Sequence, residues 1–240
     1  MERNDPLSPP KPKNIHGGHR KRTKQKFLEN GGDGFHDHQL LEMILFYAHP
    51  QGDVNPLAHE LMNRFGTLNA VLEATPEELK QVVGVSDHTA TLLKLFPAVL
   101  RSFHVHEIKP GTPVTSTEEA AEVLRHCFVG LQVETLYLLT TDAKGKLLAC
   151  DRISQGSVDA VLMDQRRIVE KIIQRRASQA YLAHCHPTGL ALASREDIWA
   201  TRRLRQTLEL LNVRLNDHLI FADGDYVSMV QSGDLEAYYG

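Results

Sequence analysis

The sequence is poor in cysteine. Its 240 residues include three, Cys127, Cys150 and Cys185, and none of them belongs to a Cys-x-x-Cys pair. An odd, scattered set of this kind excludes a disulfide framework and a cysteine-based zinc knuckle. Reduced thiols in an intracellular protein are the simplest interpretation.

Long hydrophobic runs are also missing. The first residues, MERNDPLSPPKPKN, contain no apolar stretch that would indicate a signal peptide. The most apolar window, LLEMILFYA at 40–48, is much shorter than the about 18 residues that a membrane span needs. We therefore expect a cytoplasmic protein that makes no membrane contact.

A strong excess of one charge is absent as well. The formal net charge is −3, which excludes a uniformly basic nucleic-acid binder but leaves local patches open. Hydrophobic residues make up 42% of the chain and charged residues 24%, which is typical of globular proteins with a sizeable core. The length suggests one or two domains.

The first thirty residues differ in composition from the rest. Residues 1–26 hold eight basic and two acidic residues together with four prolines. Because so few large apolar side chains are present, we predict a disordered basic tail over residues 1–30. Its basic residues, among them Arg20, Lys21 and Arg22, either keep the protein soluble or contact DNA phosphates.

Two regions follow the tail. Apolar residues recur at helical spacing through residues 31–105, which predicts an all-helical domain. Residues 106–116 contain two prolines and a glycine and are interpreted as a linker.

Residues 117–240 mix helix and strand patterns, so the fold class is α/β of the mixed α+β type. Two β-rich runs around Asp-Ala-Lys-Gly predict a hairpin over 131–154, and a second hairpin is expected over 213–229, around Asp223 and Gly224. Between them we expect a helix over 164–177, a strand over 179–184 and a helix over 195–211.

The stretch HCHPTGLALASREDI, residues 184–198, carries the clearest chemical signal. Residues i and i+2 of a strand project from the same side, so His184 and His186 aim at one point beyond the strand end. The first turn of the next helix brings Asp197 toward them. Two imidazoles and a carboxylate suit Zn²⁺ with one position left for water. Separately, each feature also has a structural interpretation, because Ser194 and Asp197 fit a helix cap and a His-x-His pair is often structural.

A hydrolytic zinc site also needs a general base, and Glu134 is the candidate. It lies in QVETLYLL, where both faces of the expected strand are apolar. An ionised carboxylate in such a strand needs a partner. The alternative is a strand-end glutamate that points into water.

These motifs resemble a known family. Residues 184–197 match the JAMM signature, His-x-His-Pro, six residues, then Ser-x-x-Asp. The surrounding segments LQVETLYLLTTDAKGKLL and SREDIWATRRLRQTLELLNVRLNDHLIFADGDYVSM resemble the RadC-like branch of the JAB/MPN family over about 105–240. Upstream, NRFGTLNAVLEATPEELKQVVGVSDHTATLL resembles the helix-hairpin-helix segment found in that family.

The resemblance implies a JAB/MPN-type central sheet flanked by helices, with Zn²⁺ bound by His184, His186 and Asp197. It further implies Glu134 as the general base and Ser194 as a donor to the oxyanion. The chain differs from the usual His-Asn-His-Pro-Ser-Gly-Asp at three positions, which here are Cys185, Thr188 and Leu190. These differences leave the ligands unchanged.

The upstream segment departs further from its pattern. A DNA-binding hairpin commonly contains Gly-x-Gly, whose amides hold a phosphate, whereas this chain has Gly84-Val85-Ser86 followed by Asp87. Gly84 is therefore a candidate phosphate contact, and a helical packing module without DNA contact is the alternative.

Two functions remain open. The first is a zinc hydrolase of the metallopeptidase type that acts on a peptide or protein substrate, whose identity the sequence does not show. The second is a DNA-repair or recombination protein that binds nucleic acid through its N-terminal half, with the zinc site structural or part of a nuclease. Glu134 and Ser194 favour the first, because a structural zinc site needs neither a base nor an oxyanion donor.

Overall fold

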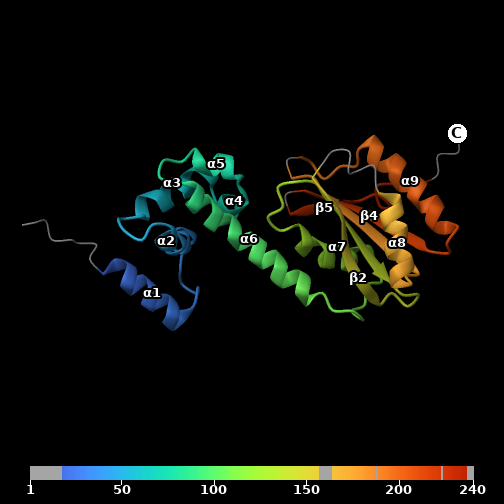
Figure 1. Ribbon diagram of the computed structural model, residues 1–240, viewed down its shortest axis with the longest axis horizontal. Helices are drawn as coiled ribbons and strands as arrows, with labels where there is room; N and C mark the ends of the chain where they lie inside the picture. Colours follow the sequence, from blue (N-terminus) through green and yellow to red (C-terminus); the bar gives the residue numbers. More distant parts are fainter. Residues whose placement is uncertain (1–17, 157–163, 188, 223, 237–240) are drawn as a thin grey trace, which may run out of the picture. The chain divides into compact units, whose positions relative to one another are not determined.

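The computed structural model describes residues 18–156, 164–187, 189–222 and 224–236. The chain divides into two compact units, Met1–Lys94 and Leu95–Gly240 (Figure 1). Each unit has a hydrophobic core of its own. Among the described residues, no helix is both long enough and apolar enough to cross a membrane.

The described part of the N-terminal unit, from residue 18 onward, contains helices and no strands, as the apolar spacing predicts. The helices are α1 (His19–Asn30), α2 (Asp37–Ala48), α3 (Asn55–Phe65), α4 (Leu68–Glu73), α5 (Pro76–Lys80) and the first part of α6 (Asp87–Glu107). Leucines at helical spacing, including Leu41, Leu45 and Leu61, are fully buried between them. A turn at Gly84, with φ of 99°, joins α5 to α6. Its resemblance to a DNA-binding hairpin stays a prediction.

The expected disordered tail is wrong for residues 19–30, which form helix α1. None of its residues is buried, and polar contacts attach it to its neighbour instead. The Arg20 guanidinium donates to the carbonyl oxygens of Phe46, His49 and Gly52 at 3.3, 2.5 and 2.7 Å. A composition rule that counts only apolar burial misses such an anchor. Residues 1–17 lie outside the described residues.

The expected linker over 106–116 is also wrong, because its second half pairs with the first hairpin. The amides of Gly111 and Val114 donate to the carbonyls of Leu147 and Gly145, both at 2.7 Å. Val114 is fully buried. The proline and glycine residues mark the end of α6, which continues to Glu107, and the boundary between the units falls within that helix.

The C-terminal unit contains a five-stranded mixed sheet. Its strands are β1 (Thr135–Thr141), β2 (Leu147–Gln155), β3 (Gln179–Cys185), β4 (Arg214–Ala222) and β5 (Asp225–Ser228). Their order is β2-β1-β3-β4-β5, and only β3 and β4 run parallel. Both expected hairpins are present. Asp223 lies outside the described residues, and Gly224 takes a φ of 78° beside it.

Helices cover both faces of this sheet. One face packs against α7 (Thr117–Arg125) and the short 3-10 helix η1 (His126–Phe128), and the other against α8 (Gln165–Arg175) and α9 (Arg195–Glu209). Strand β1 alternates accordingly, with Leu136 and Leu138 toward α8 and α9, and Tyr137 and Leu139 toward α7. This three-layer arrangement confirms the mixed α+β class, with α7 on one side of the sheet and α8 and α9 on the other (Figure 1).

Candidate metal centre

The C-terminal end of β3 presents both histidines of the motif. His184 is the penultimate residue of the strand, and His186 follows its last residue. Because side chains alternate, Cys185 turns into the α7-side core while the two imidazoles share the opposite side. His184 is 2% exposed, whereas His186 is half-buried.

The start of α9 supplies the carboxylate through a helix cap. Ser194 Oγ accepts from the Asp197 amide at 3.0 Å, while the amide and hydroxyl of Ser194 donate to Asp197 Oδ2 at 2.9 and 2.6 Å. This reciprocal capping box holds one carboxylate oxygen in place. The other, Oδ1, is buried and has no hydrogen-bond partner among the described residues.

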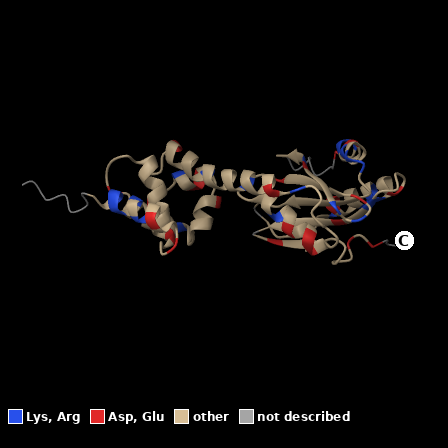
Figure 2. Cartoon of the chain, turned by 90° about the horizontal axis from the view of Figure 1, so that it is seen from below, with Lys and Arg blue, Asp and Glu red and all other residues tan. Residues whose placement is uncertain are grey.

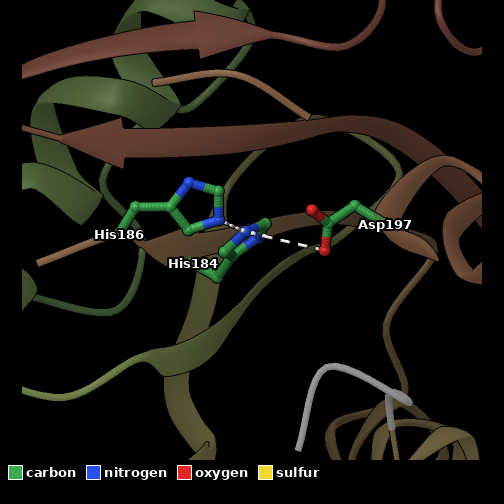
Figure 3. Close-up of side chains that lie close together, drawn as sticks. All are labelled: His184, His186 and Asp197. Atoms are coloured by element: carbon green, nitrogen blue, oxygen red, sulfur yellow. Dashed lines mark hydrogen bonds and ion pairs between the residues drawn. The ribbon is translucent and has the colours of Figure 1, made fainter. Parts of the chain in front are cut away.

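One possible ligand atom from each of the three residues lies close to the other two, and the two imidazole nitrogens form a hydrogen bond with each other. His184 Nε2 lies 2.8 Å from His186 Nε2 and 3.7 Å from Asp197 Oδ1, and all three atoms fall within 4.8 Å of one another (Figure 3). The structure therefore brings together the three predicted ligands. Two imidazole nitrogens and a carboxylate oxygen are a donor set that Zn²⁺ prefers. The unpaired, buried Asp197 oxygen fits a metal ligand better than a cap, because a cap needs only Oδ2.

The atoms on the far side of each imidazole are held in place as well. His186 Nδ1 donates to the carbonyl oxygen of Leu190 at 3.1 Å. A neutral imidazole has one N–H, so His186 Nε2 then carries a lone pair toward the centre. His184 Nδ1 lies 2.9 Å from Nε2 of His218, a residue that the motif does not include.

Burial keeps the inner histidines neutral. It lowers the pKa of His184 to about 4, with the charge of Asp197 opposing the shift and His186 adding to it. Complete burial likewise lowers the pKa of His218 well below its ordinary value. Since neutral imidazole is the ligand form, protons compete weakly with a metal at His184 near neutral pH.

Glu134 directly precedes β1 and is half-buried. Leu136 pairs with His184 across β1 and β3, so the same antiparallel register extended by two residues sets Glu134 opposite His186. Its Oε2 is buried and has no hydrogen-bond partner among the described residues. Burial raises the pKa of Cys185 to about 11, and the nearby charge of Glu134 adds to that shift. The carboxylate thus lies near the end of β3 without belonging to the three-ligand group.

The residues predicted to contact DNA lie in the N-terminal unit. Lys21 and Arg22 are exposed on α1, where Figure 2 shows basic residues gathered. Arg20 is half-buried and engaged by three carbonyls, so it serves as an anchor of α1. Gly84 occupies the turn before α6, beside Leu57.

The sequence pattern did not reveal His218, the buried residue whose ring contacts His184 on the side away from Asp197. Simple alternation along β4 groups His218 with Asn216 and Arg214, which resembles a solvent face. A register shift opposite Ala180 and Tyr181 instead puts His218 beside Leu182, on the side of the sheet that faces α9. The polar run Asn-Asp-His inside an otherwise apolar strand is the signal that could have revealed it.

Known proteins resemble this chain in both units. Residues 114–234 match the RadC-like JAB domain. A UPF0758 protein of Ruegeria pomeroyi is 31% identical over 217 residues, which cover 90% of this chain and 97% of that protein. A UPF0758 protein of Rhodobacter capsulatus is 33% identical over 213 residues, 88% of this chain and 98% of the relative. A UPF0758 protein of Fusobacterium nucleatum is 28% identical over 223 residues, which cover 90% of this chain and 96% of that protein.

The matched domain contains all three candidate ligands and Glu134, and the relatives extend the similarity over most of the helical unit. The chain therefore belongs to the RadC-like JAB domain family.

Proposed function

We propose that this protein is a zinc-dependent hydrolase of the JAMM metallopeptidase type that cleaves an amide bond in a peptide or protein. The observation that carries the proposal is the buried, unpaired Oδ1 of Asp197, which faces two imidazole nitrogens. Leaving a buried carboxylate oxygen without a partner costs roughly 1–3 kcal/mol or more, which a bound cation offsets.

His184, His186 and Asp197 would hold the metal. Bound there, Zn²⁺ would lower the pKa of a water ligand toward about 7 and polarise the carbonyl of the substrate. Three protein ligands leave a fourth position open, as in other catalytic zinc sites.

Glu134 would act as the general base. Its unpaired Oε2 is available to accept a proton from the attacking water, and the resulting carboxylic acid can donate that proton to the leaving amine. A carboxylate opposite His186 stands at the edge of the ligand group, where such a transfer takes place. A structural zinc site has no use for a buried carboxylate at this position.

Ser194 would have two roles, one in orienting Asp197 and one in stabilising the oxyanion. Its amide and hydroxyl orient Asp197, and its exposed position lets the hydroxyl rotate and donate to the oxyanion of the tetrahedral intermediate. The segment before it carries the exposed Leu190 and Leu192, at 73% and 59%. These side chains would contact the substrate beside the cleaved bond.

Zinc content of purified variants tests the proposal. We expect about one zinc per chain in the wild type and a strong loss in His184→Ala, His186→Ala and Asp197→Ala, because two ligands hold the ion poorly against solvent. The control is His88→Ala, which removes an exposed histidine of α6 and should leave zinc unchanged. Full zinc content in all three ligand variants would end the metal assignment.

A nucleic-acid contact through the N-terminal unit is a second candidate function. The exposed Lys21 and Arg22 on α1 favour it. In that case the metal centre would be structural or would serve a nuclease.

A further inference from the structure

Two of the three cysteines lie next to each other on the α7 side of the sheet. Cys127 Sγ is 3.6 Å from Cys150 Sγ, although the two residues are 23 positions apart in the sequence. Both are free thiols. The proposed hydrolysis assigns no role to either of them, so their proximity asks for an explanation of its own.

The local structure brings the two thiols together. Cys127 lies in η1 and continues the buried face of α7, because Ala120, Leu124 and Cys127 follow helical spacing and are all fully buried. Cys150 pairs with Leu139 across β2 and β1. Residues that face each other in this way have side chains on the same side of a sheet, so Cys150 also lies in the α7-side core.

The two thiols form a hydrogen-bonded pair. A thiol is both a weak donor and a weak acceptor, so the hydrogen of one points to the sulfur of the other. The hydrogen bond with Cys127, together with burial, raises the pKa of Cys150 well above its ordinary value. Since the thiolate is the reactive form, Cys150 reacts slowly near neutral pH, and the pair stays reduced unless an oxidant persists.

A small oxidant has room to reach Cys150. This residue is half-buried and lines a cavity of about 80 Å³ together with Val105, Ile108 and Pro110. One water molecule needs only about 10–15 Å³ of such accessible space, so the cavity can hold a molecule of the size of hydrogen peroxide. Cys127 is fully buried. Cys150 is therefore the sulfur that meets the oxidant first.

We propose that Cys127 and Cys150 form a modification site, at which hydrogen peroxide converts the two thiols into a reversible disulfide. The Cys150 sulfur attacks one peroxide oxygen, the O–O bond breaks, and a sulfenic acid and one water form. The Cys127 sulfur then attacks the Cys150 sulfur and displaces its hydroxyl group as a second water. Both thiol hydrogens end in these waters, and two electrons pass from the sulfurs to the peroxide.

The bond would join η1 to β2. A disulfide has an S–S distance of about 2.05 Å, so the two sulfurs must approach by about 1.5 Å from their present 3.6 Å. The closed loop would contain β1 and Glu134. Because a cross-link between residues this far apart restricts the unfolded chain, the oxidised protein should be more stable than the reduced one.

Cys185 offers an internal comparison. Its thiol donates to the carbonyl oxygen of Val133 at 3.7 Å. Burial raises the pKa of Cys185 to about 11. Its partner is thus a backbone oxygen, which cannot form a disulfide, and we expect the same oxidant to leave Cys185 unlinked.

Peptide mapping by mass spectrometry is the main test. The full-length folded protein is treated with hydrogen peroxide, the remaining thiols are blocked with iodoacetamide, and the protein is digested. We expect one cross-linked peptide pair that joins Cys127 to Cys150 with the loss of two hydrogens, an alkylated Cys185, and loss of the link after dithiothreitol. The link should be absent in Cys150→Ala and present in Cys185→Ala.

Three results would overturn the proposal. The first is that Cys127 and Cys150 both remain alkylated at a peroxide dose that oxidises glutathione in a parallel sample. The second is that they reach the sulfinic acid without forming a bond. The third is a link between two chains on a non-reducing gel in place of the link within one chain. All three are read without reference to zinc, so a failure of the proposed function leaves this test unchanged.

Thermal unfolding measures the effect of the bond. We expect the oxidised wild type to melt roughly 5 °C above the reduced protein. The Cys150→Ala variant, treated in the same way, should show no difference, and circular dichroism checks that it is folded. Equal melting temperatures for the cross-linked and reduced wild type would overturn the stabilising role of the disulfide.

Discussion

Two buried aspartates of the C-terminal unit have opposite surroundings. Asp217 is fully buried, and both of its oxygens accept hydrogen bonds: Oδ1 from two backbone amides, and Oδ2 from the hydroxyls of Thr117 and Ser228. Asp197 is equally buried at 1% exposure, yet only Oδ2 is satisfied. Its Oδ1 has no hydrogen-bond partner among the described residues.

Under the proposed function, unmet hydrogen bonding, more than burial, separates the metal-binding carboxylate of Asp197 from the structural one of Asp217. Asp217 joins α7, β4 and β5 and leaves nothing for a ligand to bind. Asp197 and Glu134 each keep one buried oxygen without a hydrogen bond. Asp197 Oδ1 lies 3.7 Å from His184 Nε2, and the register of β1 against β3 sets Glu134 opposite His186. The third atom of this kind in the described chain is the hydroxyl of Thr141, at the other end of β1, where a neutral group costs less to leave unpaired.

Glu134→Gln gives the largest effect that the comparison predicts. The amide keeps the shape of the side chain but cannot accept a proton from water, so kcat should fall about 10²- to 10⁴-fold on any substrate that is found. Zinc content and melting temperature should stay close to the wild type. Glu196→Gln, an exposed change in the first turn of α9, should alter none of the three quantities. Loss of zinc or of folding in Glu134→Gln would make Glu134 a ligand or a structural partner instead.

The two aspartates can be compared directly as asparagine variants. Asp217→Asn should lower the free energy of unfolding by about 2–3 kcal/mol, because hydrogen bonds to a charged acceptor are lost, and it should keep zinc. Asp197→Asn should lose zinc while the metal-free protein changes by less than about 1 kcal/mol, since no partner of Oδ1 is removed. Urea unfolding of metal-free proteins and elemental analysis provide both numbers. If Asp197→Asn destabilised the metal-free protein as much as Asp217→Asn does, the two aspartates would both be structural.

Much of this site was open to prediction from the sequence. A strand ending in His-x-His and a helix opening with Ser-x-x-Asp fix the local geometry by themselves, so the candidate ligands His184, His186 and Asp197 lie together as expected. Local periodicity also predicts the two hairpins and the helices of both units, because burial on one face dictates the spacing of apolar residues.

Features that depend on distant contacts escaped prediction. Helix α1 is attached by Arg20 to carbonyls 26 to 32 positions away, and no local pattern records such a partner. The pairing of Gly111 with Leu147 likewise joins segments that composition assigns to a linker and a strand. His218 was missed because one register shift exchanges the two faces of β4, an event that alternation cannot foresee.

Helix α1 offers a similar comparison between basic residues. Arg20 is hydrogen-bonded to three carbonyl oxygens, whereas Lys21 and Arg22 are exposed. Arg20→Ala should remove an anchor and loosen α1, at about 1–2 kcal/mol, which hydrogen exchange of the helix amides would detect. Replacing the exposed pair Lys21 and Arg22 by alanine should leave that exchange unchanged. If the N-terminal unit binds DNA, the pair should also reduce the salt slope of binding by roughly 2, because each phosphate contact releases counterions. If Arg20→Ala changed the salt slope and the double alanine variant did not, Arg20 would be the DNA contact, and Lys21 and Arg22 would not.

Asp151 differs from both aspartates above, because its partners are the side chains of Arg175 and Lys171 near the surface. We expect its replacement to have the smallest effect on stability. Arg175 donates from Nε and Nη2 to its two oxygens at 3.0 and 2.9 Å, and Lys171 lies 3.3 Å away. Burial alone would raise the pKa of Asp151, but the hydrogen bonds and charge of Arg175, with Lys171, outweigh it and lower the pKa.

A carboxyl whose pKa is lowered by folding stabilises the protein above its unfolded pKa of about 3.9, and that stability disappears as the pH falls through the lower folded pKa. We therefore expect Asp151→Asn to cost up to about 1 kcal/mol at pH 7, since α8 loses its ion pairs to β2. The difference from the wild type should shrink as the pH is lowered below about 4 and also in high salt, which screens pairs near the surface. Urea midpoints of both proteins across this pH range measure it. A difference that grows in acid would mean that Asp151 resists ionisation in the folded protein, and that its cation partners do not control its charge.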